Sequence, residues 1–238
     1  MWRIVLNLLK KYEMRNIFKY QILQFLIAIT LLILIKLFVV DLIGVSNGKL
    51  LGIKTSFWFW IAICTPIIHQ FYVAFVWRFE LYKNVFTSYF GIKKAFKFYS
   101  IGFSVLFVAR LISIIFLAVS NKNTLQINPI FVYILVILIV PLVVYLFYSV
   151  KKYFTVERAY GIDHFDKNYN VAYVKKGIFK YTNNGMYVFG LMILYLPGLL
   201  LFSKAAIIAA IFNHIFIWAH YYFTELPDMK EIYGKTPK

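Results

Sequence analysis

The chain has 238 residues, of which 62% are apolar, 21% aromatic and only 15% charged. Soluble domains carry about 45–50% apolar and about 25% charged residues, so this composition excludes an ordinary soluble protein. A net charge of +17 would suggest nucleic acid for a soluble protein, but here the basic residues are sorted between apolar runs, and no nucleic-acid partner is expected.

Six continuous apolar runs approach or exceed the roughly 20 residues that a helix needs to cross a bilayer. Because a segment in lipid must satisfy its own backbone hydrogen bonds, we expect an all-α, polytopic bundle of about six transmembrane helices. The first 15 residues lack a small-residue cleavage site and predict an interfacial helix, not a signal peptide. The expected spans are residues 20–40, 56–77, 98–119, 130–150, 186–202 and 205–223.

Lysine and arginine alternate between the segments that connect these spans. Five precede residue 20, five lie at residues 78–97 and seven at 151–180, whereas the segments between them carry one or two each. The positive-inside rule predicts that both termini and the large loop at 151–185 face the cytoplasm. We therefore expect a multi-pass integral membrane protein in contact with membrane lipid, and nothing in the sequence indicates its oligomeric state.

The nine carboxylates are unevenly placed, and six of them lie at or after Glu157. Chemistry that needs a carboxylate is therefore expected at the cytoplasmic ends of the last three spans. A metal site is not expected, because Cys64 is the single cysteine and the spacing of His214 and His220 differs from the i, i+4 spacing of helical metal pairs.

The last predicted span carries more polar groups than a lipid-facing helix tolerates, so they must face protein or a wet cavity. Interhelical hydrogen bonding is the alternative explanation for the asparagine and the histidines. A spacing of 3.6 residues per turn predicts one face with His214, Trp218, Tyr221 and Glu225, and a neighbouring stripe with Asn213, His220 and Thr224.

Two ionisable residues, His69 and Arg110, fall inside the second and third predicted spans. Ionisable residues within a membrane are functional candidates by default. Arg110 either binds a lipid phosphate or pairs with a carbonyl group or another helix, and the sequence leaves both open.

A second polar segment, YTNNGMYVFG at residues 181–190, begins the fifth predicted span. An N-cap role explains one asparagine, but it does not account for Asn183, Asn184 and Tyr187 together. The short connection at 203–204 makes the fifth and sixth spans antiparallel neighbours, so this segment and Glu225 are expected to lie close together.

These residues resemble motifs of the membrane-embedded methyltransferases. Phospholipid N-methyltransferases carry S-N-N-P-M-Y before a membrane helix, and residues 182–187 read TNNGMY. A second motif, E-E-P followed by I-Y, is similar to ELP at 225–227 and IYG at 232–234. Isoprenylcysteine carboxyl methyltransferases place G-x-[FY]-R-Y before the first motif, and residues 177–181 read GIFKY; a weaker G-D-Y-F motif is echoed by DHF at 163–165. The sequence departs from the family at Gly185, usually proline, and at Leu226, usually a second glutamate.

The resemblance implies S-adenosylmethionine as the methyl donor, with His220 or Glu225 as the catalytic group that takes a proton from the acceptor. A carboxylate and aromatic faces suit the cationic donor, and a helix N-terminus suits its carboxylate. It also implies that residues 1–122 are an accessory part and residues 123–238 the methyltransferase-like core. Substrate contacts are assigned to Arg110, His214 and Trp218. The implied cofactor-binding residues are Gly177, Tyr181, Asn183, Asn184, Met186, Tyr187, Tyr221, Glu225 and Asp228.

The form of the first motif favours an amino-phospholipid head group as the methyl acceptor over the carboxylate of a prenylated cysteine. Two further alternatives remain: an NADPH-dependent membrane reductase of the steroid-reductase type, and a non-enzymatic transporter or lipid-binding protein. Neither the number of methyl groups transferred nor the role of the first three spans follows from the sequence.

Overall fold

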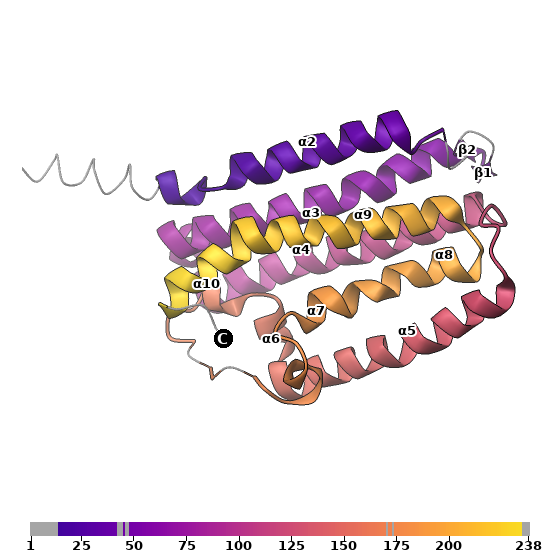
Figure 1. The fold of residues 1–238 in the computed structure, drawn as a ribbon. Helices are drawn as coiled ribbons and strands as arrows, with labels where there is room; N and C mark the ends of the chain where they lie inside the picture. Colours follow the sequence, from indigo (N-terminus) through magenta and orange to yellow (C-terminus); the bar gives the residue numbers. More distant parts are fainter. Residues whose placement is uncertain (1–13, 42–44, 46–47, 170, 173, 235–238) are drawn as a thin grey trace, which may run out of the picture.

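The computed structural model describes residues 14–41, 45, 48–169, 171–172 and 174–234. The interfacial helix predicted for the first 15 residues lies almost entirely outside this part of the chain. The described residues form a bundle of long helices (Figure 1), with one short antiparallel hairpin of strands β1 (Lys49–Leu50) and β2 (Ile53–Lys54). The expected all-α, polytopic architecture is confirmed.

Five helical segments of the described chain are long and apolar enough to cross a membrane. They contain α2 (Gln21–Phe38), α3 (Thr55–Lys83), α4 (Val85–Ser120), α5 (Pro129–Ser149) and α9 (Lys204–His220). Two of them continue through π-helical turns: α5 runs into η1 (Val150–Phe154), and α9 runs through η5 (Tyr221–Glu225) into α10 (Leu226–Tyr233).

Local sequence signals explain where two of these helices begin. The Asn128 side chain caps α5 by accepting a hydrogen bond from the backbone N–H of Ile130 at 2.9 Å, and Pro129 occupies the first helical position. Ser203 caps α9 in the same way, accepting from the backbone N–H of Ala206 at 3.2 Å.

The fifth predicted span is the element that departs from expectation. Residues 185–200 form a shorter apolar segment made of α7 (Gly185–Val188), the 3-10 helix η4 (Gly190–Tyr195) and α8 (Leu196–Leu200). A Cβ atom at Gly190 would lie 2.9 Å from Leu146, so this segment packs closely against α5. Figure 1 shows that α7 begins part-way along the bundle, level with the interior of α3 and α9. The number of membrane crossings therefore stays a prediction.

The centre of the bundle is formed by α3, α4 and α9, which pack on one another. Ala205, Ala206, Ala209 and Ala210 of α9 are fully buried, and such small residues allow close approach between membrane helices. Because α3 and α9 pack together, the predicted accessory part and the predicted core are not separate in space. The division at residue 122 remains a prediction about sequence organisation.

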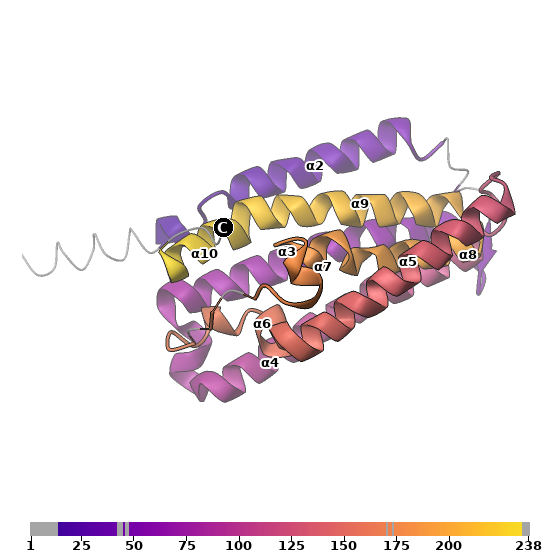
Figure 2. The same ribbon diagram turned by 60° about the horizontal axis from the view of Figure 1, so that its bottom comes forward.

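Three short elements cover one end of the bundle, which we call the loop end. They are α6 (Val156–Ala159), η2 (Ile162–His164) and η3 (Gly177–Lys180). Figures 1 and 2 show α6 close to the end of α5 and beside α7, with α10 at the same end of the molecule. The polar motifs of the sequence are thus gathered at the loop end.

Candidate active site

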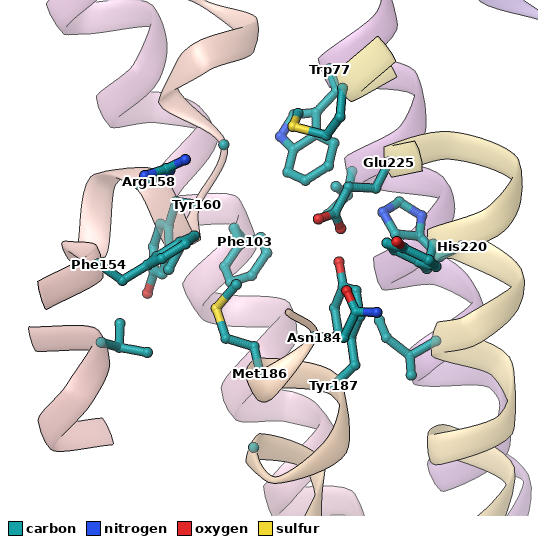
Figure 3. Close-up of a pocket in the computed structure, with 18 of the residues that line it drawn as sticks. Trp77, Phe103, Phe154, Arg158, Tyr160, Asn184, Met186, Tyr187, His220 and Glu225 are labelled. Carbon is teal, nitrogen blue, oxygen red and sulfur yellow. The ribbon is translucent and has the colours of Figure 1, made fainter. Parts of the chain in front are cut away.

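A cavity of about 660 Å³ lies at the loop end, within the range of pockets that hold cofactors and drug-sized ligands. Its wall takes residues from α3, α4, α5 with η1, the α6–η2 segment, α7 and α9 with η5. Helix α7, which begins part-way along the bundle (Figure 1), contributes residues to this wall. Figure 3 shows aromatic side chains on both sides of this space, including Phe103, Tyr160 and Tyr187.

The π-helical turn η5 determines which residues of the last helix line the cavity. In this turn the backbone N–H of Leu226 bonds to the carbonyl of Tyr221, five residues earlier, so positions five apart come onto one side. His220, Tyr221 and Glu225 therefore line the cavity together. Of the face predicted for this helix, Tyr221 and Glu225 line the cavity, whereas His214 and Trp218 do not.

Glu225 is the carboxylate of η5 that lines the cavity, and its Oε2 atom is buried with no hydrogen-bond partner among the described residues. In Figure 3 its carboxylate and the Tyr187 hydroxyl point toward one another, with the Asn184 side chain beside them. The two motifs of the sequence thus meet, as their order along antiparallel segments predicted. An unpaired buried carboxylate oxygen facing a cavity is a ready acceptor for a cationic or hydrogen-bonding ligand.

The first motif supplies the opposite side of this arrangement. Asn184 stands at the N-cap of α7, yet its side chain makes no capping hydrogen bond there. The side chains of Asn184, Asn183, Met186 and Tyr187 line the cavity instead. The ring of Tyr187 packs edge-on against Tyr221, with centroids 5.8 Å apart, which fixes its direction.

Three residues of the predicted cofactor set lie outside the cavity wall. Tyr181 is 75% exposed. Gly177 packs against α5, where an added Cβ would lie 2.5 Å from the Ser149 hydroxyl oxygen. Asp228 is fully buried and forms an ion pair with Arg78 of α3 at 3.1 Å. Gly177 and Asp228 therefore make structural contacts, whereas Tyr181 is exposed at the surface.

The predicted substrate residues are also divided by the structure. Arg110 lines the cavity, whereas His214 and Trp218 do not. His214 Nδ1 lies 3.2 Å from the Tyr195 hydroxyl, and Trp218 packs edge-on against Tyr187 with centroids 6.0 Å apart. Trp218 thus supports a cavity residue without lining the cavity.

A buried polar cluster fixes η2 at the loop end, and the sequence analysis did not assign it. The ring of His164 stacks on Trp77 of α3 with centroids 4.1 Å apart, and its Nδ1 lies 3.2 Å from the Asp163 carboxylate. Tyr233 of α10 donates a hydrogen bond to the other Asp163 oxygen at 3.0 Å. Trp77, His164, Asp163 and Tyr233 all line the cavity.

Electrostatics within this cluster favour its charged form. Burial opposes protonation of His164, but the nearby carboxyl groups of Asp163 and Asp228 prevail and raise the pKa of the imidazole to about 9. Burial likewise opposes ionisation of Asp163, but hydrogen bonds from His164 and Tyr233 and the His164 charge lower the pKa of that carboxyl. At neutral pH the cluster therefore holds an imidazolium beside the Asp163 carboxylate.

The first three spans contribute more to the cavity than the sequence indicated. His69, Trp77 and Phe103 come from α3 and α4 and line the cavity wall. The weak similarity of residues 163–165 (DHF) to the G-D-Y-F motif was the sequence feature that indicated η2. For Trp77 and Phe103 the sequence offers no signal, because each is one aromatic among many in an apolar helix.

Comparison with known proteins finds a family match in the C-terminal part of the chain. The family model of the phospholipid methyltransferases matches residues 127–236, which contain α5, the loop-end elements and α7 to α10. No curated protein and no solved structure matched the chain. The resemblance to the membrane-embedded methyltransferases is thus confirmed for the C-terminal part of the chain, and this integral membrane protein matches the phospholipid methyltransferase family over residues 127–236.

Proposed function

We propose that this protein is an S-adenosylmethionine-dependent methyltransferase that acts on the head group of an amino-phospholipid. The observation that carries the proposal is the meeting of Glu225 with Asn184 and Tyr187 at one cavity, inside the region that matches the phospholipid methyltransferases. The cavity is proposed to open toward the cytoplasm, where the positive-inside rule places the loop end.

The residues of the cavity fit the chemical groups of the donor. Glu225 Oε2, His220 Nδ1 and the indole N–H of Trp77 are buried without hydrogen-bond partners among the described residues. Carboxylates and aromatic faces stabilise cations such as a sulfonium or an ammonium group, and Tyr187 and Tyr221 supply such faces here. The cationic side chain of Arg158, on the cavity wall near Phe154 (Figure 3), suits a carboxylate.

When bound, S-adenosylmethionine supplies a methyl group on cationic sulfur, whose carbon–sulfur bond breaks as the lone pair of the acceptor nitrogen forms the new carbon–nitrogen bond. A protonated amine has no lone pair, so a base in the cavity must first take its proton. His220 Nδ1 and the Glu225 carboxylate, brought onto one side by η5, are the two groups placed for this. The protein otherwise acts by positioning both reactants and excluding water.

A test of this function is incubation of membranes containing the protein with donor labelled on its methyl group, followed by lipid extraction. Label is expected in a phospholipid head group, and membranes that carry Glu225→Gln should show little. Label in a prenylated protein would instead indicate the carboxyl methyltransferase alternative. Thermal stabilisation of the purified protein by NADPH, with none by S-adenosylmethionine, would contradict the proposal in favour of a reductase.

A further inference from the structure

Arg110 is a buried cation whose charge is not matched by the residues around it. Its side chain is 3% exposed, and it lies well inside the membrane-spanning α4. Nε donates to the Asn213 side-chain oxygen at 2.9 Å, and Nη1 lies 3.4 Å from His69 Nδ1. Nη2 has no hydrogen-bond partner in the described part of the chain.

Neither of these partners is a carboxylate, and burying a charge without a counter-charge is costly. Arg78 differs from Arg110 in this respect, because its equally buried guanidinium pairs with the Asp228 carboxylate at 3.1 Å. Arg110 instead lines the cavity. A guanidinium with a free N–H in a cavity suits an anion such as a phosphate or a carboxylate.

The cavity also has a side that faces the lipid. Helices α4 and α5 make almost no direct contact in the described structure, and α8 packs against both of them away from the loop end. Toward the loop end the cavity lies between them, with Phe107 of α4 and Phe147 of α5 in its wall. Phe147 is 45% exposed, so this wall reaches the outside of the bundle within a membrane-spanning segment.

We propose that Arg110, held by Asn213 and His69, binds the phosphate of the phospholipid acceptor, which enters between α4 and α5. The inference rests on the proposed function and names the group by which the acceptor is recognised. His220 lies seven residues, or about 10 Å, beyond Asn213 along α9 toward the loop end. With its phosphate bound at Arg110, a phosphoethanolamine group extends along this direction with its amine toward His220.

The proposed placement of the phosphate at Arg110 and the amine toward His220 agrees with the orientation of a phospholipid in the bilayer. In the leaflet at the loop end, the phosphate lies nearer to the bilayer centre than the amine does. Arg110 lies correspondingly deeper than His220 and Glu225, which belong to the end of α9 and to η5. The donor also carries a carboxylate, so the test must separate a lipid phosphate from that second source of anion.

The test compares purified Arg110→Met with wild type and with Lys97→Met, which removes an exposed cation from the same helix. Thermal stabilisation in a maltoside detergent is titrated with dihexanoyl-phosphatidylethanolamine, with dihexanoylglycerol and with S-adenosylmethionine. We expect the phospholipid, but not the phosphate-free lipid, to stabilise wild type and Lys97→Met. Arg110→Met should need about ten- to a hundredfold more phospholipid, as for a lost charged hydrogen bond, with its response to the donor unchanged.

Other outcomes overturn the phosphate site. A donor response that falls in Arg110→Met while the phospholipid response stays would assign the anion to the donor carboxylate. Unchanged responses to both ligands, or equal stabilisation by dihexanoylglycerol, would show that phosphate is not recognised. If Arg110→Met does not fold, Arg110→Gln removes the charge and keeps a polar side chain beside Asn213, and a phospholipid response identical to wild type in that variant would overturn the proposal.

Failure of the proposed function gives a different pattern. In that case lipid extracts carry no label from the donor, while stabilisation by the short-chain phospholipid still depends on Arg110. The phosphate site would then stand as a lipid-binding site of a protein with another activity.

Discussion

The guanidinium of Arg78 and the carboxylate of Asp228 lie 3.1 Å apart, and both side chains are almost completely buried. Arg78 is in α3, 150 residues before Asp228 in α10, and it also donates to the backbone carbonyl of Phe223 at 2.8 Å. The pair thus ties the region that matches the phospholipid methyltransferases to a helix outside it. This contact stabilises the wall of the cavity without lining it.

Removing one member of this pair is expected to destabilise the folded protein. Asp228→Asn leaves a buried guanidinium without its counter-charge, a change that costs about 3–5 kcal/mol in comparable pairs. The thermal unfolding midpoint of the purified protein should fall clearly. The double variant Arg78→Met with Asp228→Leu should lose less than the sum of the single variants. If Asp228→Asn weakens donor binding but unfolds like wild type, Asp228 is a ligand, as the sequence resemblance implied.

Glu225→Gln keeps the size of the side chain and removes its charge. We expect donor binding to weaken at least about tenfold, since a charged hydrogen bond contributes about 1.5–3 kcal/mol, while the unfolding midpoint without ligand is kept. Isothermal titration with S-adenosylmethionine measures the change. Glu157→Gln, at an exposed position of α6, is the matched control and should bind like wild type. Unchanged affinity in Glu225→Gln would refute a cofactor role for this carboxylate.

Asn184→Ala separates a capping role from a ligand role. The Asn184 side chain makes no capping hydrogen bond in α7, so its removal should leave the unfolding midpoint nearly unchanged and weaken donor binding. Asn183→Ala, at a more exposed cavity position, provides the comparison. A lower midpoint with unchanged affinity in Asn184→Ala would favour the capping explanation instead.

Stability should depend on pH through His164. Its folded-state pKa is raised to about 9 above an ordinary value near 6.5. The stabilisation by the imidazolium is therefore fully present below about pH 6.5 and is lost as the pH rises through about 9. Unfolding midpoints measured from pH 6.5 to 9.5 should fall in wild type. His164→Phe keeps an aromatic ring on Trp77 and should show a flatter profile, and an equally steep fall in that variant would contradict the assignment.

The sequence was sufficient for the elements that depend on local pattern. Apolar runs predicted six spans, five of which correspond to long helices of the described chain. The order of the two polar motifs along antiparallel segments placed Asn184 and Glu225 together. The broken form of the fifth predicted span, with its 3-10 turns, was not predicted, because hydropathy does not distinguish a continuous helix from a broken one. The π-helical turn at Glu225 was not predicted either, because no sequence periodicity reveals a single π-helical turn.

The contacts of the first three spans could not be predicted from the sequence, for a different reason. Arg78 and Asp228, or Trp77 and His164, are paired by tertiary packing between distant segments, and one sequence carries no record of such pairing. Arg110 was singled out because a charge in an apolar helix is costly. The sequence could not decide whether that charge faced a partner or a cavity.

The position at which α7 begins determines the medium in which the cavity residues work. Because this helix starts inside the bundle, the cavity residues that it carries lie deeper than the ends of α3 and α9 (Figure 1). Electrostatic interactions there act through a lower dielectric than at the membrane surface. Transfer of a methyl group from a cation to a neutral amine spreads charge over both partners, and a poorly polar medium favours such spreading. A water-soluble amine would have to leave its hydration shell to reach that depth, whereas a lipid head group is already anchored beside it.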